Sequence, residues 1–367
     1  MDVWTIPFFV VGVAALVAGA EALVRGAARL AARTGLSPVV IGLTVVAFGT
    51  SAPELAVSLG AGIRGEADLA VGNVVGSNIA NVLLVLGMSA VVGGGLVVAQ
   101  RIVRIDVPLM MLLSIAVFAL GLDGDLDRWE GLAFVVALVV YVMWTVMSTR
   151  RSNEVAVAEE YDEALGEDTL QASSAWADLG YVLAGLVLLV VGSSALVEAA
   201  TDIAEALGVS ELVIGLTVVA VGTSMPEIAT SVVAAARGQR DIAVGNAVGS
   251  NLFNILGVLG ITALVSPSSI AISDGAISLD IPVMIAVAIA CLPIFWNGYA
   301  LQRWEGWVFL VYYAAYIVWL VLDSGDHGVR EKYAVALLGF VIPLTVLTFV
   351  VIAWRERRAG PSPVIEP

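Results

Sequence analysis

The chain has 367 residues, of which 60% are hydrophobic and 13% are charged, and its mean hydropathy is +0.98. A soluble globule of this size needs far more polar surface, so we expect an integral membrane protein surrounded by the lipid bilayer. The formal net charge of −15 disfavours nucleic-acid partners. The single cysteine, Cys291, excludes an internal disulfide and is expected to fill the core.

Apolar runs of about 20 residues predict membrane-spanning helices, because barrel strands are shorter and alternate in polarity. The first run has neither a basic segment before it nor a small-residue cleavage site after it, so we interpret it as a retained span. The first five spans are predicted at residues 5–30, 37–62, 69–95, 105–121 and 129–148.

An acidic linker separates these spans from a second set of five and one further span. We interpret the linker as a solvated cytoplasmic tether in preference to a cation sensor. The later spans are predicted at residues 177–205, 211–236, 242–265, 279–296, 303–322 and 333–354. The chain is thereby divided into a first five-span repeat (1–148), the linker (149–176), a second five-span repeat (177–322), and an additional span with a basic tail (323–367).

Two stretches of the chain are nearly identical. VIGLTVVAFGTSAPEL ends at Leu55 and VIGLTVVAVGTSMPEI ends at Ile228, so Glu54 and Glu227 lie 173 positions apart (227 minus 54). Because five spans is an odd number, the second copy must enter the membrane from the other side. We therefore predict an all-α polytopic membrane protein with two inverted five-helix repeats, ten core helices in all, and one extra C-terminal transmembrane helix.

The loop charges predict an orientation. Most loop arginines fall on one side of the predicted membrane, and only Arg64, Arg128, Arg330 and Lys332 fall on the other. By the positive-inside rule, we expect a multi-pass protein of the cell (plasma) membrane with its N-terminus outside and its C-terminus in the cytoplasm.

Other matched residues are assigned to structure. Arg128-Trp129-Glu130-Gly131 matches Arg303-Trp304-Glu305-Gly306, and Asp106 and Pro108 match Asp280 and Pro282. We interpret these as interfacial anchors and helix starts. His327 lies in a polar connector, which disfavours a buried catalytic imidazole.

The paired motifs GTSAPE (residues 49–54) and GTSMPE (residues 222–227) predict opened helices, since glycine relaxes the backbone and proline removes an amide donor. A freed carbonyl in hydrocarbon needs another partner, and a cation can serve. The candidate ligands are all oxygens, which suit hard ions such as Ca²⁺ and Na⁺ rather than zinc or copper. They are the carbonyls of Ala47, Thr50, Ala220 and Thr223, the hydroxyls of Thr50, Ser51, Thr223 and Ser224, and the carboxylates of Glu54 and Glu227.

The following spans add polar side chains at four-residue spacing, which places them on one helix face. These are Asn73, Ser77 and Asn81 in one copy and Asn246, Ser250 and Asn254 in the other. One interpretation is that these side chains only hold helices together, and the other is that they contact ions. For Asn73 and Asn246 both interpretations stay open, whereas for the two serines and for Asn81 and Asn254 we favour ion contact.

The two glutamates have no candidate partner for a salt bridge, because neither motif span carries Lys or Arg near its middle. Two unpaired carboxylates close together must share a proton or be neutralised by a cation. We therefore predict that Glu54 and Glu227 bind a metal ion and take up protons when the ion leaves.

These motifs resemble the α-repeats of the calcium/cation antiporter superfamily, and the GTSxPE form is similar to its prokaryotic sodium/calcium exchanger branch. The resemblance covers both five-span halves, whereas the eleventh span departs from the ten-span prokaryotic pattern. It implies a non-enzymatic antiporter without a cofactor, which transports Ca²⁺ and Na⁺ by alternating access, with H⁺ as a competitor and with spans one and six sliding over the core.

The resemblance also implies ligand sets. A central Ca²⁺ site would use Glu54, Glu227 and the carbonyls of Thr50 and Thr223. One Na⁺ site would use Ala47, Thr50, Ser51, Ser77 and Glu227, and the other Ala220, Thr223, Ser224, Ser250 and Glu54, with Asn81 and Asn254 facing the middle. Potassium-dependent relatives, and part of the prokaryotic branch, have aspartate where this chain has Asn254, so potassium co-transport is disfavoured.

Two carboxylates balance one Ca²⁺, whereas three Na⁺ would leave one net positive charge, so we expect electrogenic exchange. The main alternative is a proton/calcium antiporter of the same superfamily, although those relatives usually have asparagine where this chain has Thr50 and Thr223. An ion channel would usually need rotational symmetry. An intramembrane hydrolase would need a nucleophile with a base, or a metal with histidine, and the predicted spans contain neither.

Overall fold

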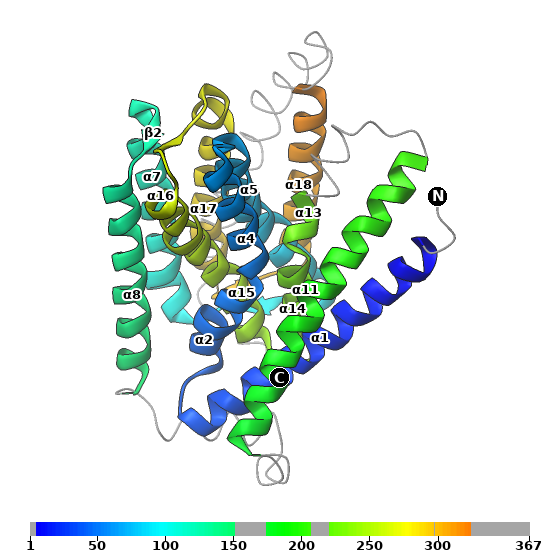
Figure 1. The fold of residues 1–367 in the computed structure, drawn as a ribbon. Helices are drawn as coiled ribbons and strands as arrows, with labels where there is room; N and C mark the ends of the chain where they lie inside the picture. The colour runs from blue at the N-terminus through cyan, green and yellow to red at the C-terminus, as the bar shows by residue number, and fades with distance from the viewer. Residues whose placement is uncertain (1–4, 151–173, 207–219, 297, 324–367) are drawn as a thin grey trace.

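The structure, a computed structural model, describes residues 5–150, 174–206, 220–296 and 298–323, which form a helical bundle (Figure 1). Within these ranges, eight helical segments are long and apolar enough to cross a membrane. They are α1 (Thr5–Thr34); α5, η2 and α6 (Ala67–Ala80, Asn81–Leu86, Gly87–Val92); η3, α7 and η4 (Ile102–Asp106, Val107–Leu120, Gly121–Asp123); α8 (Arg128–Arg150); α11 (Ala175–Ala206); α15, η6 and α16 (Arg240–Phe253, Asn254–Leu259, Gly260–Val265); η7 and α17 (Ala276–Asp280, Ile281–Trp296); and α18 (Arg303–Asp323).

A bent pair of segments adds a ninth candidate span. The first part comprises α2 (Pro38–Ile41), the π-helical turn η1 (Gly42–Val46) and α3 (Ala47–Thr50), and it meets α4 (Ala52–Arg64) at an angle of 46°. The corresponding part of the second half contains α13 (Ala220–Thr223) and α14 (Met225–Ala236). The predicted, predominantly helical membrane fold is therefore confirmed.

Several predicted segments lie wholly or partly outside the described residues. The span at 211–236 is described only from residue 220 onward, and the linker at 149–176 is mostly outside. The span at 333–354 and His327 are entirely outside. The other nine predicted spans coincide with helices, and the span expected at 105–121 begins three residues earlier, at Ile102.

Helices α1 and α11 lie side by side along one flank of the bundle and run antiparallel (Figure 1). Glycines recur every seven residues in both helices, at Gly12, Gly19 and Gly26 in α1 and at Gly185 and Gly192 in α11. A Cβ on Gly185 would lie 2.6 Å from the Leu23 amide nitrogen and 2.7 Å from the Gly19 carbonyl oxygen. The backbones therefore touch, as small residues allow between membrane helices.

Polar contacts hold both ends of this helix pair. Near one end the Thr5 hydroxyl donates to Asp202 (3.0 Å), and near the other the Arg33 guanidinium donates to the buried Asp178 carboxylate (2.6 Å). Glu21 on α1 forms a 2.7 Å ion pair with Arg237, which follows α14. Helices α1 and α11 are thus bonded to each other near both ends, and α1 also contacts the end of α14, the helix that carries the second motif glutamate.

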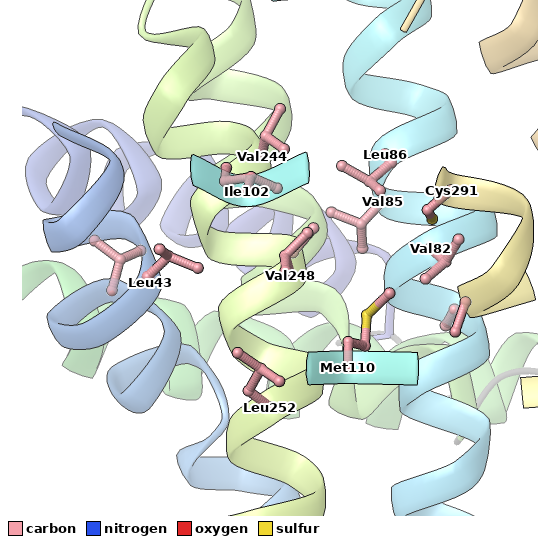
Figure 2. Close-up of a cluster of buried hydrophobic side chains, with 14 of the residues drawn as sticks. Leu43, Val82, Val85, Leu86, Ile102, Met110, Val244, Val248, Leu252 and Cys291 are labelled. Atoms are coloured by element: carbon pink, nitrogen blue, oxygen red, sulfur yellow. The ribbon is translucent and has the colours of Figure 1, made fainter. Parts of the chain in front are cut away.

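The centre of the bundle is formed by the spans that contain α5 and α15. These spans are 78% and 83% buried, against 22–39% for the other long helices, so they contact protein on nearly all sides. Figure 2 shows Val248 and Leu252 of α15 between Leu43 of η1 and Met110 of α7. Cys291 is fully buried in the same apolar cluster, as expected.

Two short antiparallel ladders join the two halves of the chain. Strand β1 (Leu96–Val97) pairs with β4 (Ala300–Leu301), and β2 (Asp125–Leu126) pairs with β3 (Ile270–Ala271). Each ladder therefore takes one strand from each half.

The repeated RWEG segments cap and pack helices. The Glu130 carboxylate accepts from the Asp127 amide (2.8 Å) and Glu305 accepts from the Gln302 amide (2.7 Å), which is the geometry of a capping box. A Cβ on Gly131 would lie 2.8 Å from the Gly260 carbonyl oxygen. The matched aspartates also have matched partners, since Tyr141 donates to Asp106 (2.9 Å) and Tyr316 to Asp280 (3.0 Å).

We predict that Gly185→Val destabilises the folded protein, because any side chain at residue 185 must push against the α1 backbone. Overpacking of this kind costs about 1–3 kcal/mol or more. Thermal unfolding of the detergent-purified protein should show a lower midpoint. Gly180→Ala on the same helix is the matched control, because nothing lies within 4 Å of the added Cβ. Equal midpoints for the two variants would show that α1 and α11 do not touch at residue 185.

Candidate functional site

Each motif interrupts its helix at a serine. Ser51 separates α3 from α4 with φ −80° and ψ 8°, and Ser224 separates α13 from α14 with φ −85° and ψ 7°. Pro53 and Pro226 are the second residues of the helices that follow, where a missing amide hydrogen is tolerated. The two breaks therefore have the same local geometry.

The motif glutamates lie in the first turns of α4 and α14, and neither side chain is exposed to solvent. Their bonding crosses between the halves. The Ser51 hydroxyl donates to Glu227 Oε1 (3.3 Å) and the Ser224 hydroxyl donates to Glu54 Oε1 (3.4 Å). Each acid is therefore held by the serine of the other motif, which brings the two carboxylates into one cluster.

The second oxygen of each carboxylate, Oε2 of Glu54 and of Glu227, is buried and has no hydrogen-bond partner in the described ranges. Among the described residues, no Arg or Lys forms a salt bridge with either acid. An ionised carboxylate in such surroundings is strongly destabilised unless a cation or a proton neutralises it. The geometry therefore suits a cation placed between the two acids.

Asparagines of the central helices support the motif backbones. The Asn73 amide donates to the carbonyl oxygen of Glu54 (3.0 Å), and the Asn246 amide donates to that of Glu227 (3.4 Å). Both asparagines therefore have a clear structural role, which was one of the two interpretations left open by the sequence.

The threonine hydroxyls face the same helices. Thr50 Oγ1 donates to Asn246 Oδ1 (3.0 Å) and lies 3.4 Å from the Ser250 hydroxyl oxygen. Thr223 Oγ1 donates to Asn73 Oδ1 (3.4 Å). Each motif thus contacts the central helix of the other half, α3 with α15 and α13 with α5.

Ser77 completes the hydrogen-bonded part of the cluster. Its hydroxyl oxygen accepts from Ser224 (3.3 Å), the same serine that contacts Glu54. The carboxylates, hydroxyls and amides described so far form two hydrogen-bonded networks, one around each glutamate, and each network spans both halves.

Asn81 and Asn254 are fully buried beside π-helical turns, as the first residues of η2 and η6. In the part of the chain that the structure describes, neither side-chain amide has a hydrogen-bond partner at its nitrogen or its oxygen. Buried amides are nearly always bonded, and π-turns often mark functional sites. Their amides are therefore available to contact a ligand. No described hydrogen bond joins them to the networks around the glutamates.

The remaining predicted ligands are the two motif alanines. The Ala47 carbonyl oxygen accepts the Ser51 amide (3.0 Å) and lies 3.4 Å from Thr50 Oγ1, so it faces the break but already has a partner. Ala220 is the first residue of α13. Its side chain lies outside the part of the chain that the structure describes.

Sequence reasoning missed two pairs of polar residues. Ser58 and Ser231 accept the asparagine amides, Asn73 at 2.8 Å and Asn246 at 2.9 Å. Their positions four residues after each motif glutamate could have revealed them. The others are Asn78 and Asn251, which are buried and donate to the sulfurs of Met284 (3.5 Å) and Met110 (3.1 Å). Their repeat is visible in the sequence, but the methionine partners are not.

A model of the family described as "Sodium/calcium exchanger protein" matches residues 4–147 and 178–322. The chain is 36% identical over 292 residues to inner membrane protein YrbG of Escherichia coli strain K12, covering 78% of this chain and 87% of that protein. It is 32% identical over 319 residues to sodium/calcium exchanger MaX1 of Methanosarcina acetivorans, covering 78% and 90%. The solved structure of the sodium-calcium exchanger NCX_Mj, soaked with 2.5 mM Na⁺ and 0.1 mM Ca²⁺, is 29% identical, with a TM-score of 0.73 and coverage of 87% and 99%.

We predict that Asn246→Ala lowers the stability of the protein, because it removes a donor to the Glu227 carbonyl and the acceptor of the Thr50 hydroxyl. Leaving buried polar groups unpaired costs about 1–3 kcal/mol. Thermal unfolding in detergent measures the effect. Ser114→Ala is the control, since that buried hydroxyl bonds only the Met110 carbonyl of its own helix (2.8 Å). A midpoint for Asn246→Ala no lower than that of the control would contradict the supporting role of this residue.

Proposed function

The chain belongs to the sodium/calcium exchanger protein family and is a polytopic membrane cation antiporter, and from that premise we propose that it exchanges Na⁺ for Ca²⁺ by alternating access. We further propose that this exchange is electrogenic and independent of K⁺. Proton/calcium exchange is the alternative that the experiments below must separate from it.

One observation carries the proposal: two carboxylates from different halves are buried together, and each is hydrogen-bonded by the serine of the opposite motif. This arrangement requires a positive charge and offers only oxygen atoms around it, which favours a hard cation such as Ca²⁺ or Na⁺. Since Na⁺ and Ca²⁺ would compete for the same carboxylates, their occupancies are coupled, which is the basis of an antiport.

We assign Ca²⁺ to Glu54, Glu227 and the carbonyls of Thr50 and Thr223. Na⁺ would use the hydroxyls around each carboxylate, at Ser51 and Ser77 on one side and at Ser224 and Ser250 on the other, together with the backbone of Ala47 and Ala220. Asn81 and Asn254 would face the ions with their unpartnered amides. Asn73 and Asn246 would hold the ligands in place rather than bind ions.

An inverted repeat would give this site two equivalent access paths, one from each side of the membrane. Three features support it: the motifs recur at one sequence offset, the first helices of the two halves run antiparallel, and the ladders pair one strand from each half. We propose the orientation predicted by the loop arginines, with the N-terminus outside, the linker and C-terminus in the cytoplasm, and the protein in the cell membrane.

The first test is ⁴⁵Ca²⁺ uptake into proteoliposomes with an outward Na⁺ gradient, compared with a pH gradient alone. We expect uptake driven by the Na⁺ gradient, and a loss of at least tenfold in Glu54→Gln and Glu227→Gln, because each variant lacks one of the two charges that balance Ca²⁺. Glu66→Gln is the control. That acid is exposed, and hydrogen bonds from Arg64 lower its pKa, so it carries a negative charge but lies outside the cluster.

Uptake that follows the pH gradient and ignores Na⁺ would establish proton/calcium exchange instead. Full activity in both glutamine variants would remove these acids from the site.

The second test addresses charge movement. Exchange of three Na⁺ for one Ca²⁺ moves one net positive charge per cycle, and the two carboxylates, with no third charge at Asn254, neutralise the Ca²⁺ load but not the Na⁺ load. An inside-positive potential, which favours net outward movement of positive charge, should therefore accelerate Na⁺-driven Ca²⁺ uptake, with about 2.3 kcal/mol available per charge for each 100 mV. Uptake at zero and at imposed potential measures this effect, and replacing K⁺ by choline should leave the rate unchanged. A rate insensitive to potential would indicate electroneutral exchange.

A further inference from the structure

The proline of the second motif leaves a backbone acceptor without its usual donor. In a continuous helix the amide of residue 226 would bond the carbonyl of residue 222, but Pro226 has no amide hydrogen. The Gly222 carbonyl lies directly before Thr223 and Ser224, which belong to the polar network around Glu54. How this carbonyl is satisfied therefore bears on the geometry of the cluster.

The replacement donor comes from a different helix. The Ser193 hydroxyl of α11 donates to the Gly222 carbonyl oxygen at 2.6 Å, and Ser193 is only 5% exposed. One turn further along α11, the Val197 side chain packs closely on Gly222. A Cβ added to Gly222 would clash with that side chain. The same helix contacts the first motif, where Leu186 packs against Gly49. Helix α11 therefore lies against both motif turns but donates a hydrogen bond to this one.

The sequence supplies this hydroxyl in only one half. Residues 190–197 (VVGSSALV) match residues 17–24 (VAGAEALV) at the offset of the motifs, and Ala20 stands at the position that matches Ser193. Ala20 is fully buried and cannot donate a hydrogen bond from its side chain. The two otherwise similar halves therefore differ in how the carbonyl before the motif threonine can be satisfied.

We propose that Ser193 is a positioning residue for the cation site: its hydroxyl replaces the amide removed by Pro226 and holds the Gly222–Ser224 turn so that Thr223, Ser224 and Glu227 face the cluster. This inference rests on the proposed function of the site. If Ser193 has this role, the position of α11 affects cation affinity although α11 supplies none of the proposed ligands.

The experiment compares Ser193→Ala and Ser193→Thr with Ser194→Ala in the full-length, detergent-purified protein. Ser194 is the neighbouring control, because it is exposed and its hydroxyl donates to the Val190 carbonyl of its own helix (3.0 Å). Equilibrium ⁴⁵Ca²⁺ binding and the thermal midpoint are measured for each. We expect about tenfold weaker binding in Ser193→Ala, the scale of one lost buried hydrogen bond, and affinities close to the unsubstituted protein in Ser193→Thr and Ser194→Ala.

Hydrogen exchange gives a readout that does not depend on the cargo. Without added cation, a peptide covering residues 220–228 should exchange faster in Ser193→Ala than in Ser194→Ala, because the turn has lost its external donor. If Ser193→Ala does not fold, Ser193→Cys keeps a donor at this position, although a weaker and larger one, and should give an intermediate loss of affinity.

Unchanged affinity and exchange in a folded Ser193→Ala protein would overturn the proposal, and so would a lower thermal midpoint with unchanged affinity. Absence of Ca²⁺ binding in the unsubstituted protein would instead count against the proposed function, and the exchange result would then decide the role of Ser193 alone.

Discussion

The structure depends on one electrostatic constraint: two carboxylates are buried in an apolar bundle, and no basic side chain of the described residues pairs with either of them. Burial of one such charge is costly, and burial of two close together is stable only when positive charge is supplied from outside. An arginine side chain at this place would neutralise Glu54 and Glu227 permanently, and a cation from solution would then not be needed. The absence of an ion pair at these acids, within the described residues, therefore distinguishes the cluster from a structural salt bridge and supports the proposed cation site.

The same constraint explains why the halves are linked so thoroughly around the acids. A helix broken by proline in an apolar environment must find partners for its carbonyls elsewhere. Here Asn73 and Asn246 supply donors from the central helices, and Ser193 supplies one from the flank. Because Thr50 and Thr223 each donate a hydrogen bond to the other half, the geometry of each motif is coupled to that of the other half.

Much of the site could be predicted because it is duplicated. Repetition at one offset identified Glu54 and Glu227, and proline within each motif predicted the interruption of its helix. The crossed bonds from Ser51 to Glu227 and from Ser224 to Glu54 could not be predicted, because they depend on how the halves pack. The ladders were also missed, since strands of two residues leave no alternating pattern. Ser193 has no polar counterpart at Ala20, so a search for repeats overlooks it.

That last difference matters for a transporter built from two similar halves. If transport exchanges the roles of the halves, perfect symmetry would make the two end states equal in free energy without ions or voltage. If the hydrogen bond from Ser193 forms in only one end state, a hydroxyl present at residue 193 and absent at residue 20 removes this equality by roughly 1 kcal/mol. Helices α1 and α11 pack closely at their glycines, so a bias at Ser193 would act on both helices together. The residues that distinguish the repeats, and not those that match, then decide which side of the membrane the empty site prefers.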